Sequence, residues 1–198
     1  MVHISENELK TLNFLIRHFT EKYSINQLAK KLGITPKGLH KLLKRLEENN
    51  IVKPEKLANA VFYKINFASD LARKSAELSL FENIKLPYAR VQAKDLDSLR
   101  EFVLAAVLFG SVLKKGDKAG DIDVLLVFEK KNYQKVKKEV DEIQKIKPKH
   151  IQIVMQTPKD LINNLKKPDK VLLEILRTGK VLWGCEVIVS SIKEVVEK

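Results

Sequence analysis

The 198-residue chain has one cysteine, four histidines and no long uninterrupted apolar run. Its single cysteine, Cys185, excludes an intrachain disulfide and any zinc site built from several thiolates. The histidines are scattered, without the paired spacing of a structural metal site. Every apolar stretch falls short of the roughly 20 residues that cross a bilayer, and the first residues lack a secretory signal pattern. The sequence therefore predicts a cytoplasmic protein with no membrane partner.

Acidic residues are also scarce, with 25 of them against 37 lysines and arginines, which leaves a net charge of +12. Residues 1–66 hold twelve basic and six acidic side chains, so one third of the chain carries half of the excess. Such an excess favours a polyanionic partner. A lysine-rich, glycine-poor composition is also typical of proteins from hot environments, so charge alone does not identify the partner.

Three short amphipathic helices are predicted in the first 50 residues. Capping boxes start the first two helices at Ser5 and Ser24, and Thr35 with Pro36 provides the N-cap and first residue of the third. Gly33 ends the second helix, which leaves only a short turn before the third. This spacing is typical of a helix-turn-helix.

Two strands are predicted after the third helix, at residues 51–54 and 60–65, with residues 55–59 as the tip between them. The whole segment 1–66 resembles the winged-helix DNA-binding domains of small prokaryotic and archaeal regulators. The basic, exposed face of the third helix would then enter a major groove. The candidate DNA-contacting residues are Lys37, His40, Lys41, Lys44 and Arg45. A winged helix used only for protein contact is the alternative.

Residues 67–85 have helical spacing without glycine or proline, and Pro87 is predicted to close this helix. We expect residues 67–89 to form a helical connector between two domains. Because winged-helix regulators are often dimers, this helix is also the candidate contact with a second copy of the chain.

Strands and helices alternate from residue 90 to residue 198. A helix over 95–102 is predicted to lead into a strand at 104–109. The later predicted strands are 121–128 and 150–156, with a short strand or turn at 181–184. The helices between them are 132–146, 157–165 and 169–177. This alternation predicts a small α/β domain with a mixed sheet, so the fold class of the whole chain is α+β.

The most informative motif joins a Gly110-Ser111 turn at the end of one predicted strand to Asp121 and Asp123 at the start of the next. Two carboxylates at i and i+2 on a strand point to one face, while Ile122 between them points into the core. Such a pair can hold Mg²⁺ together with phosphate oxygens. The Gly-Ser turn offers close backbone approach, free N–H groups and a hydroxyl to the phosphate.

This motif resembles the signature of the DNA polymerase beta-like nucleotidyltransferase superfamily: an apolar residue, Gly-Ser, a spacer and Asp-apolar-Asp. The spacer here has nine residues. The resemblance covers residues 90–198, and it implies that Asp121 and Asp123 are catalytic and bind Mg²⁺ or Mn²⁺ with the triphosphate of an NTP. The nucleotide-binding residues that it implies are Gly110, Ser111, Lys114 and Lys115. The lysines belong to the spacer and are candidates for holding the leaving pyrophosphate.

One position departs from the family pattern, which usually supplies a third carboxylate from a following strand. Gln152 occupies that position here, and a neutral amide is a poor metal ligand; His150 on the same face could accept a proton. Two functions therefore stay open. The first is nucleotidyl transfer to a protein or nucleic-acid acceptor. The second is a DNA-binding transcription regulator whose nucleotidyltransferase domain senses nucleotide without catalysis.

Overall fold

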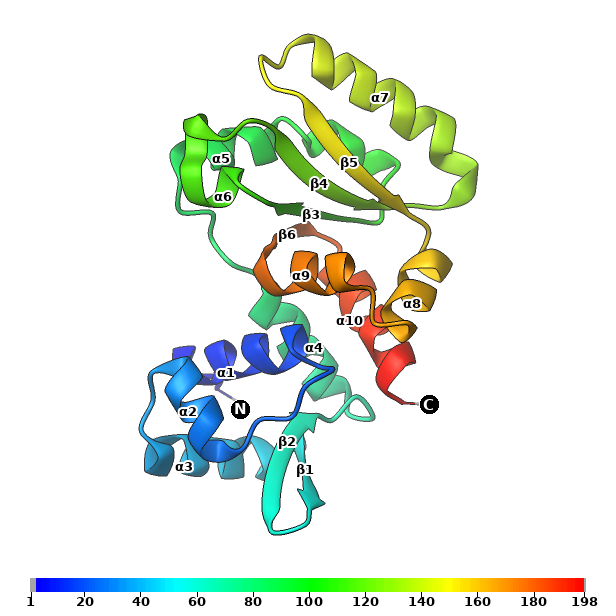
Figure 1. Ribbon diagram of the computed structural model, residues 1–198. Helices are drawn as coiled ribbons and strands as arrows, with labels where there is room; N and C mark the ends of the chain where they lie inside the picture. Colours follow the sequence, from blue (N-terminus) through cyan, green and yellow to red (C-terminus); the bar gives the residue numbers. More distant parts are fainter. Residues whose placement is uncertain (1–2, 198) are drawn as a thin grey trace. The chain divides into compact units, whose positions relative to one another are not determined.

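The computed structural model describes residues 3–197, and the chain forms two compact units (Figure 1). The first unit ends at Leu80, and the second is Phe81–Val195; Val196 and Glu197 are grouped with the first unit. Within residues 3–197, every helix is too short or too polar to cross a membrane. Each unit has its own core and is described separately.

Three helices begin the first unit: α1 (Glu6–Arg17), α2 (Ile25–Leu32) and α3 (Pro36–Glu48). The predicted N-caps Ser5, Ser24 and Thr35 are confirmed, because each side chain accepts a hydrogen bond from the backbone N–H three residues later. Gly33 ends α2 with φ +69°, a left-handed conformation that glycine adopts without strain. The turn between α2 and α3 is therefore as short as the sequence predicts.

The wing is a two-stranded antiparallel sheet of β1 (Val52–Leu57) and β2 (Ala60–Ile65). The expected five-residue tip over 55–59 is wrong, because pairing continues as far as Leu57 with Ala60 and leaves two residues in the turn. The proline inside β1 is compatible with this pairing, since both strands of a two-stranded sheet are edge strands.

Helix α4 (Asp70–Leu80) belongs to the first unit and packs against α1. Ala72 and Ala76 are fully buried, and Asn13 of α1 donates a side-chain hydrogen bond to the carbonyl of Ser79. The segment expected as a connector, residues 67–89, is thus divided between the two units, because one face of α4 is needed to close the first core. Its role in contacting a second copy stays a prediction.

The second unit is built on a four-stranded mixed sheet in the order β5-β4-β3-β6. Strand β3 is antiparallel to β4 and β6, whereas β4 and β5 are parallel, which confirms the mixed sheet and the α+β class. The strands are β3 (Ala105–Phe109), β4 (Ile122–Val127), β5 (Ile151–Gln156) and β6 (Lys180–Trp183).

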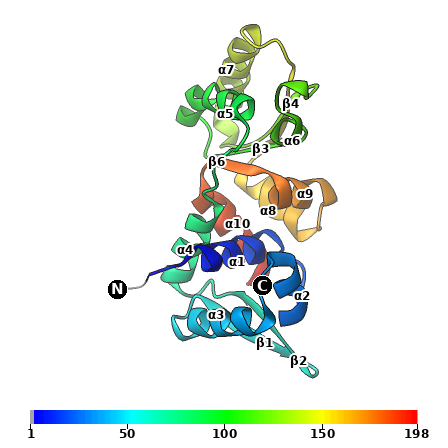
Figure 2. The ribbon, with the colours of Figure 1, turned by 90° about the vertical axis from the view of Figure 1, so that its left-hand side faces the viewer.

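Helices cover both faces of this sheet (Figures 1 and 2). On one face lie α5 (Pro87–Lys94) and α7 (Tyr133–Lys145), over a core that includes Leu108, Val124 and Leu126. On the other face, α8 and α9 contact β5 and β3 respectively, and α10 lies beside them. These three helices are α8 (Pro158–Lys166), α9 (Lys170–Thr178) and α10 (Cys185–Val196).

Two local expectations for the second unit are wrong. Pro87 starts α5 instead of closing the helix before it, since proline suits the first helical position. Residues 95–102 contain only the 3₁₀ helix η1 (Asp97–Glu101). The spacer before the aspartates is also partly helical, with α6 (Val112–Lys115) and the 3₁₀ helix η2 (Gly116–Lys118). A third 3₁₀ helix, η3 (Lys130–Asn132), precedes α7.

Candidate nucleotide site and nucleic-acid surface

A sharp turn follows β3 at Gly110, where φ is +75°. A Cβ atom at this position would lie 2.8 Å from Cγ of Asp123. Real Cβ contacts are not this short, so Gly110 is required both by the backbone conformation and by the neighbouring carboxylate. The chain then passes through Ser111 into α6.

Asp121 and Asp123 flank the fully buried Ile122 at the start of β4, and Asp123 pairs with Phe109 of β3. Burial raises the pKa of Asp123, the negative charge of Asp121 raises it further, and a backbone hydrogen bond from Ser111 only partly opposes this. No lysine or arginine in residues 3–197 forms an ion pair with either carboxylate. The pair therefore lacks a compensating cation.

The neighbouring strand brings no third acid to the carboxylates. In the parallel register of β4 and β5, Gln152 lies beside Asp123, and the N–H of Ile122 donates to the carbonyl of His150 at 2.9 Å. Within residues 3–197, no group of three or more histidine, cysteine, aspartate or glutamate side chains could hold a metal ion. The donor set fits one hard divalent cation that takes its other ligands from phosphate or water.

A pocket of 570 Å³ opens beside the Gly-Ser turn. Gly110, Ser111, Lys114 and Lys115, all expected at the nucleotide, line it, whereas Asp121 and Asp123 are not among its lining residues. The opposite wall comes from α9, and the sequence analysis missed its contribution. These α9 residues are Lys170, Val171, Glu174, Ile175 and Thr178. The only indication in the sequence was the polar face of the helix predicted over 169–177. A polar helix face does not reveal which strand end the helix will cover.

Lys149 fixes the spacer that leads into the first aspartate. Its Nζ atom donates to the backbone carbonyls of Asp117 and Ala119, and it lies 5.1 Å from the centroid of the Tyr88 ring. Because Ala119 is two residues before Asp121, this contact restrains the start of β4. No sequence motif indicates this role.

The exposed face of α3 carries Lys37, His40 and Lys41, all solvent-accessible as the sequence predicts. Lys44 is exposed as well, but it forms an ion pair with Glu47 at 2.8 Å. Three of these four side chains share a helical face at i, i+4 and i+7, the spacing with which a recognition helix presents side chains to a groove.

Arg45, which was also expected to contact DNA, lies inside the ion-pair network of its own unit. Its Nε donates to Oε1 of Glu8 at 2.7 Å, and Glu8 is only 2% exposed. Burial alone would raise the pKa of Glu8, but hydrogen bonds from Arg45 and Ser5 outweigh it and lower the pKa. We therefore leave Arg45 out of the DNA-contacting set, because it is needed to compensate a buried carboxylate.

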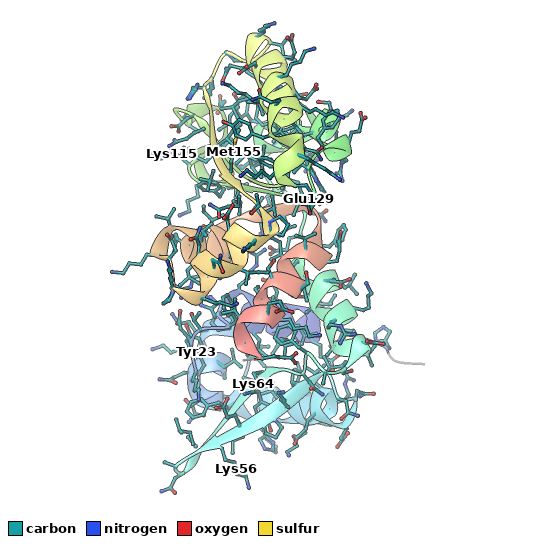
Figure 3. The ribbon with its side chains drawn as sticks, turned by 90° about the vertical axis from the view of Figure 1, so that its right-hand side faces the viewer. Tyr23, Lys56, Lys64, Lys115, Glu129 and Met155 are labelled. Atoms are coloured by element: carbon teal, nitrogen blue, oxygen red, sulfur yellow. The ribbon has the colours of Figure 1, made fainter. Side chains whose placement is uncertain are left out.

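The wing adds further positive charge (Lys56 and Lys64 are labelled in Figure 3). Glu55 accepts a hydrogen bond from Lys22 at 2.6 Å and forms an ion pair with Lys64 at 3.1 Å. The contact with Lys22 connects the wing to the segment before α2. Lys56, near the tip, is exposed. Wing and α3 thus present basic side chains from one unit.

Comparison with family models matches both units. Residues 4–53 match the winged helix-turn-helix DNA-binding family, and residues 92–186 match the polymerase beta, nucleotidyltransferase family. No curated protein and no solved structure matches the chain. The chain therefore carries a segment that matches winged helix-turn-helix DNA-binding domains, followed by a segment that matches the polymerase beta nucleotidyltransferase family.

Proposed function

We propose that the second unit transfers a nucleotidyl group from an NTP to an acceptor oxygen on a protein or a nucleic acid, with Mg²⁺ or Mn²⁺. The observation that carries this proposal is the close packing of Gly110 on Asp123, beside an uncompensated carboxylate pair. A phosphate can approach a turn without side chains, and the paired carboxylates attract the cation that accompanies it.

Each group of residues has a separate task in this proposal. Gly110 offers its backbone N–H and Ser111 its hydroxyl to the β- and γ-phosphates, and Lys114, Lys115 and Lys170 offset their negative charge. Asp121 and Asp123 hold the divalent cation, which when bound would neutralise charge on the phosphate oxygens. The acceptor oxygen attacks the α-phosphorus, the bond to the bridging oxygen breaks, and pyrophosphate leaves.

The proton of the acceptor needs a base, and the neutral amide of Gln152 beside Asp123 cannot take it. This observation favours a second candidate function, in which the domain binds nucleotide as a sensor and the protein acts as a DNA-binding transcription regulator. Both functions require the same nucleotide site, and only the first requires transfer.

The test uses the full chain with each of the four α-labelled NTPs, Mg²⁺ or Mn²⁺, and a cell extract as the source of acceptor. Transfer predicts a labelled product that the double variant Asp121→Asn, Asp123→Asn does not form. Asp117→Asn, in the exposed part of the spacer, is the matched control and should retain labelling. Metal-dependent nucleotide binding without labelling would support the sensor, and the absence of both would contradict both functions.

We further propose that α3 contacts duplex DNA through Lys37, His40, Lys41 and Lys44. Replacing Lys37 and Lys41 with alanine should weaken DNA binding and reduce the dependence of log K on log salt by about 0.9 for each phosphate that the variant no longer neutralises. Lys74→Ala, which removes an exposed lysine paired with Glu77 elsewhere in the same unit, serves as the control. Equal affinity for the α3 variant and the control would contradict the model.

A further inference from the structure

Positive charge is concentrated on a short stretch of the second unit that the proposed function does not use. Residues 129–138 contain five lysines and one acid. These lysines are Lys130, Lys131, Lys135, Lys137 and Lys138, and in the described part of the chain none of them forms an ion pair. They occupy η3 and the first half of α7.

Lysines at the start of α7 are unfavourable for the stability of that helix. The N-terminal end of a helix favours acidic side chains, because the unpaired N–H groups there carry partial positive charge. The first turn of α7 contains no acid, and cations gather there instead. Helix stability therefore does not explain the lysines, whereas an anionic partner would.

An exposed aromatic residue, Tyr133, lies between these lysines in the sequence. Tyr133 is 44% exposed, and its ring centroid lies 6.4 Å from that of the buried Phe128. Both rings line a pocket of about 760 Å³ whose other walls include Met155 and Pro158. Lys130 and Lys159 lie at the same pocket, together with Glu129 and Asp160 (Glu129 and Met155 are labelled in Figure 3).

The pocket is separate from the candidate nucleotide site. It lies where β4 and β5 end, at Phe128 and Gln156, whereas Asp121 and Asp123 lie where β4 begins. A strand of six residues spans roughly 20 Å. We call Tyr133 with Lys130, Lys131, Lys137 and Lys138 the Tyr133 surface, and leave out Lys135, whose Nζ atom lies 5.5 Å from the centroid of the Phe102 ring.

The geometry points to a single strand of nucleic acid as the partner of the Tyr133 surface. An unpaired base can stack on the exposed tyrosine above the apolar floor, and the lysines meet the phosphates that follow along the strand. Duplex DNA would not fill the pocket, since its bases are stacked inside the helix. This binding surface goes beyond the proposed function, because it does not depend on nucleotidyl transfer or on α3.

The test measures binding of fluorescent 12-nucleotide RNA and DNA strands to the full chain, in which Lys37 and Lys41 of α3 are already replaced by glutamine. Changing Lys131, Lys137 and Lys138 to glutamine should weaken binding at least tenfold near 0.1 M salt and lower the salt slope by about 0.7 for each phosphate released from a lysine. The matched control changes three exposed lysines of the same unit, Lys85, Lys94 and Lys167, and should leave affinity within twofold.

Stacking is tested at the tyrosine itself. Tyr133→Ala should weaken single-strand binding at least fivefold, whereas Tyr133→Phe should retain it, because only the ring is needed. An equal loss in the control triple variant, tighter binding of duplex than of single strands, or wild-type affinity of Tyr133→Ala would each overturn the inference. Metal-dependent NTP binding is recorded on the same variants, so a failure here is distinguishable from a failure of the proposed function.

Discussion

The backbone of Gly110 lies directly against the carboxylate of Asp123, so the turn and the acid that follows thirteen residues later form one site. The register explains this contact, since Phe109 at the end of β3 pairs with Asp123 near the start of β4. Any side chain at residue 110 would displace the carboxylate.

Replacing Gly110 with alanine should therefore abolish metal-dependent nucleotide binding and lower the free energy of unfolding by about 1–3 kcal/mol, the range for strained backbone positions. Isothermal titration with Mg²⁺ and a non-hydrolysable NTP, together with urea unfolding, measures both effects. Gly120→Ala is the matched control, because a Cβ there meets nothing within 4 Å and φ is not positive. Unchanged nucleotide affinity in Gly110→Ala would contradict the site.

The raised pKa of Asp123 predicts how stability and metal binding depend on pH. Because the folded state holds the proton more tightly than the unfolded state, ionised Asp123 destabilises the metal-free fold above its folded pKa. This penalty should disappear as the pH falls toward the ordinary value of 3.8. At neutral pH, Asp123→Asn should thus raise the melting temperature of the metal-free protein.

The same variant should lose stabilisation by Mg²⁺ with nucleotide, which thermal melts with and without both ligands will measure. Glu142→Gln is a useful reference with the opposite sign, since its ion pair with Lys145 lowers the pKa of Glu142. A metal-free Asp123→Asn protein that melts below wild type at neutral pH would show that the carboxylate is compensated after all.

Lys149 is predicted to act as a positioning residue for Asp121. Lys149→Met removes the donor to the carbonyls of Asp117 and Ala119, so the spacer should loosen and the Kd for metal–nucleotide should rise several-fold while the fold persists. Lys149→Arg, which keeps donors and charge, should partly restore affinity. Lys145→Met, on the exposed face of α7, is the control. A melting temperature that falls without any change in Kd would assign Lys149 a structural role alone.

Because Arg45 pairs with Glu8, we expect two basic residues of α3 to have different roles: Arg45 should stabilise the first unit, and Lys41 should bind DNA. Arg45→Met should lower the free energy of unfolding, because it leaves the buried Glu8 without its charged donor and with hydrogen bonds from Ser5 alone. The contribution of Glu8 should be lost as the pH falls through its lowered pKa. Lys41→Met should change stability by less than about 0.5 kcal/mol and instead weaken DNA binding.

Urea unfolding and a salt-titrated DNA-binding assay on both variants distinguish these effects. If Arg45→Met were as stable as wild type but bound DNA poorly, Arg45 would return to the DNA-contacting set.

Local signals in the sequence identified most elements of both units. Capping residues such as Ser5 and Thr35 act within one turn, so they predict helix starts without knowledge of the tertiary structure. The start of α5 at Pro87 was missed because proline is compatible with both a helix start and a helix stop. The length of β1 was missed because pairing, and not composition, decides where a hairpin turns.

The part of the candidate site that could be predicted comes from residues close in sequence, on two strands that pair directly with each other. Gly110 and Asp123 lie on consecutive antiparallel strands, so their proximity follows from one hairpin-like pairing. Lys170 of α9 and Lys149 reach the site by tertiary packing, and no spacing rule links them to it. Whether Arg45 contacts DNA stays a prediction. Its pairing with the buried Glu8 was missed because an exposed arginine and the partner of a buried glutamate look identical in a helical pattern.

The final prediction concerns the amide beside the metal ligands. Gln152→Glu places a third carboxylate next to Asp123 in the register of β4 and β5. Without metal, the added charge should raise the pKa of Asp123 further and lower stability at neutral pH. With Mn²⁺ and a non-hydrolysable NTP, it should bind the ion more tightly and, by electron paramagnetic resonance, take up a second equivalent.

Gln156→Glu, on the same strand but at its far end, is the matched control and should leave the stoichiometry unchanged. If Gln152→Glu also increases labelling of an acceptor, the neutral amide limits turnover in the wild-type chain, because a carboxylate can take the proton that an amide cannot. If Mn²⁺ affinity falls instead, residue 152 points away from the aspartates, and the argument for a site limited to one cation fails with it.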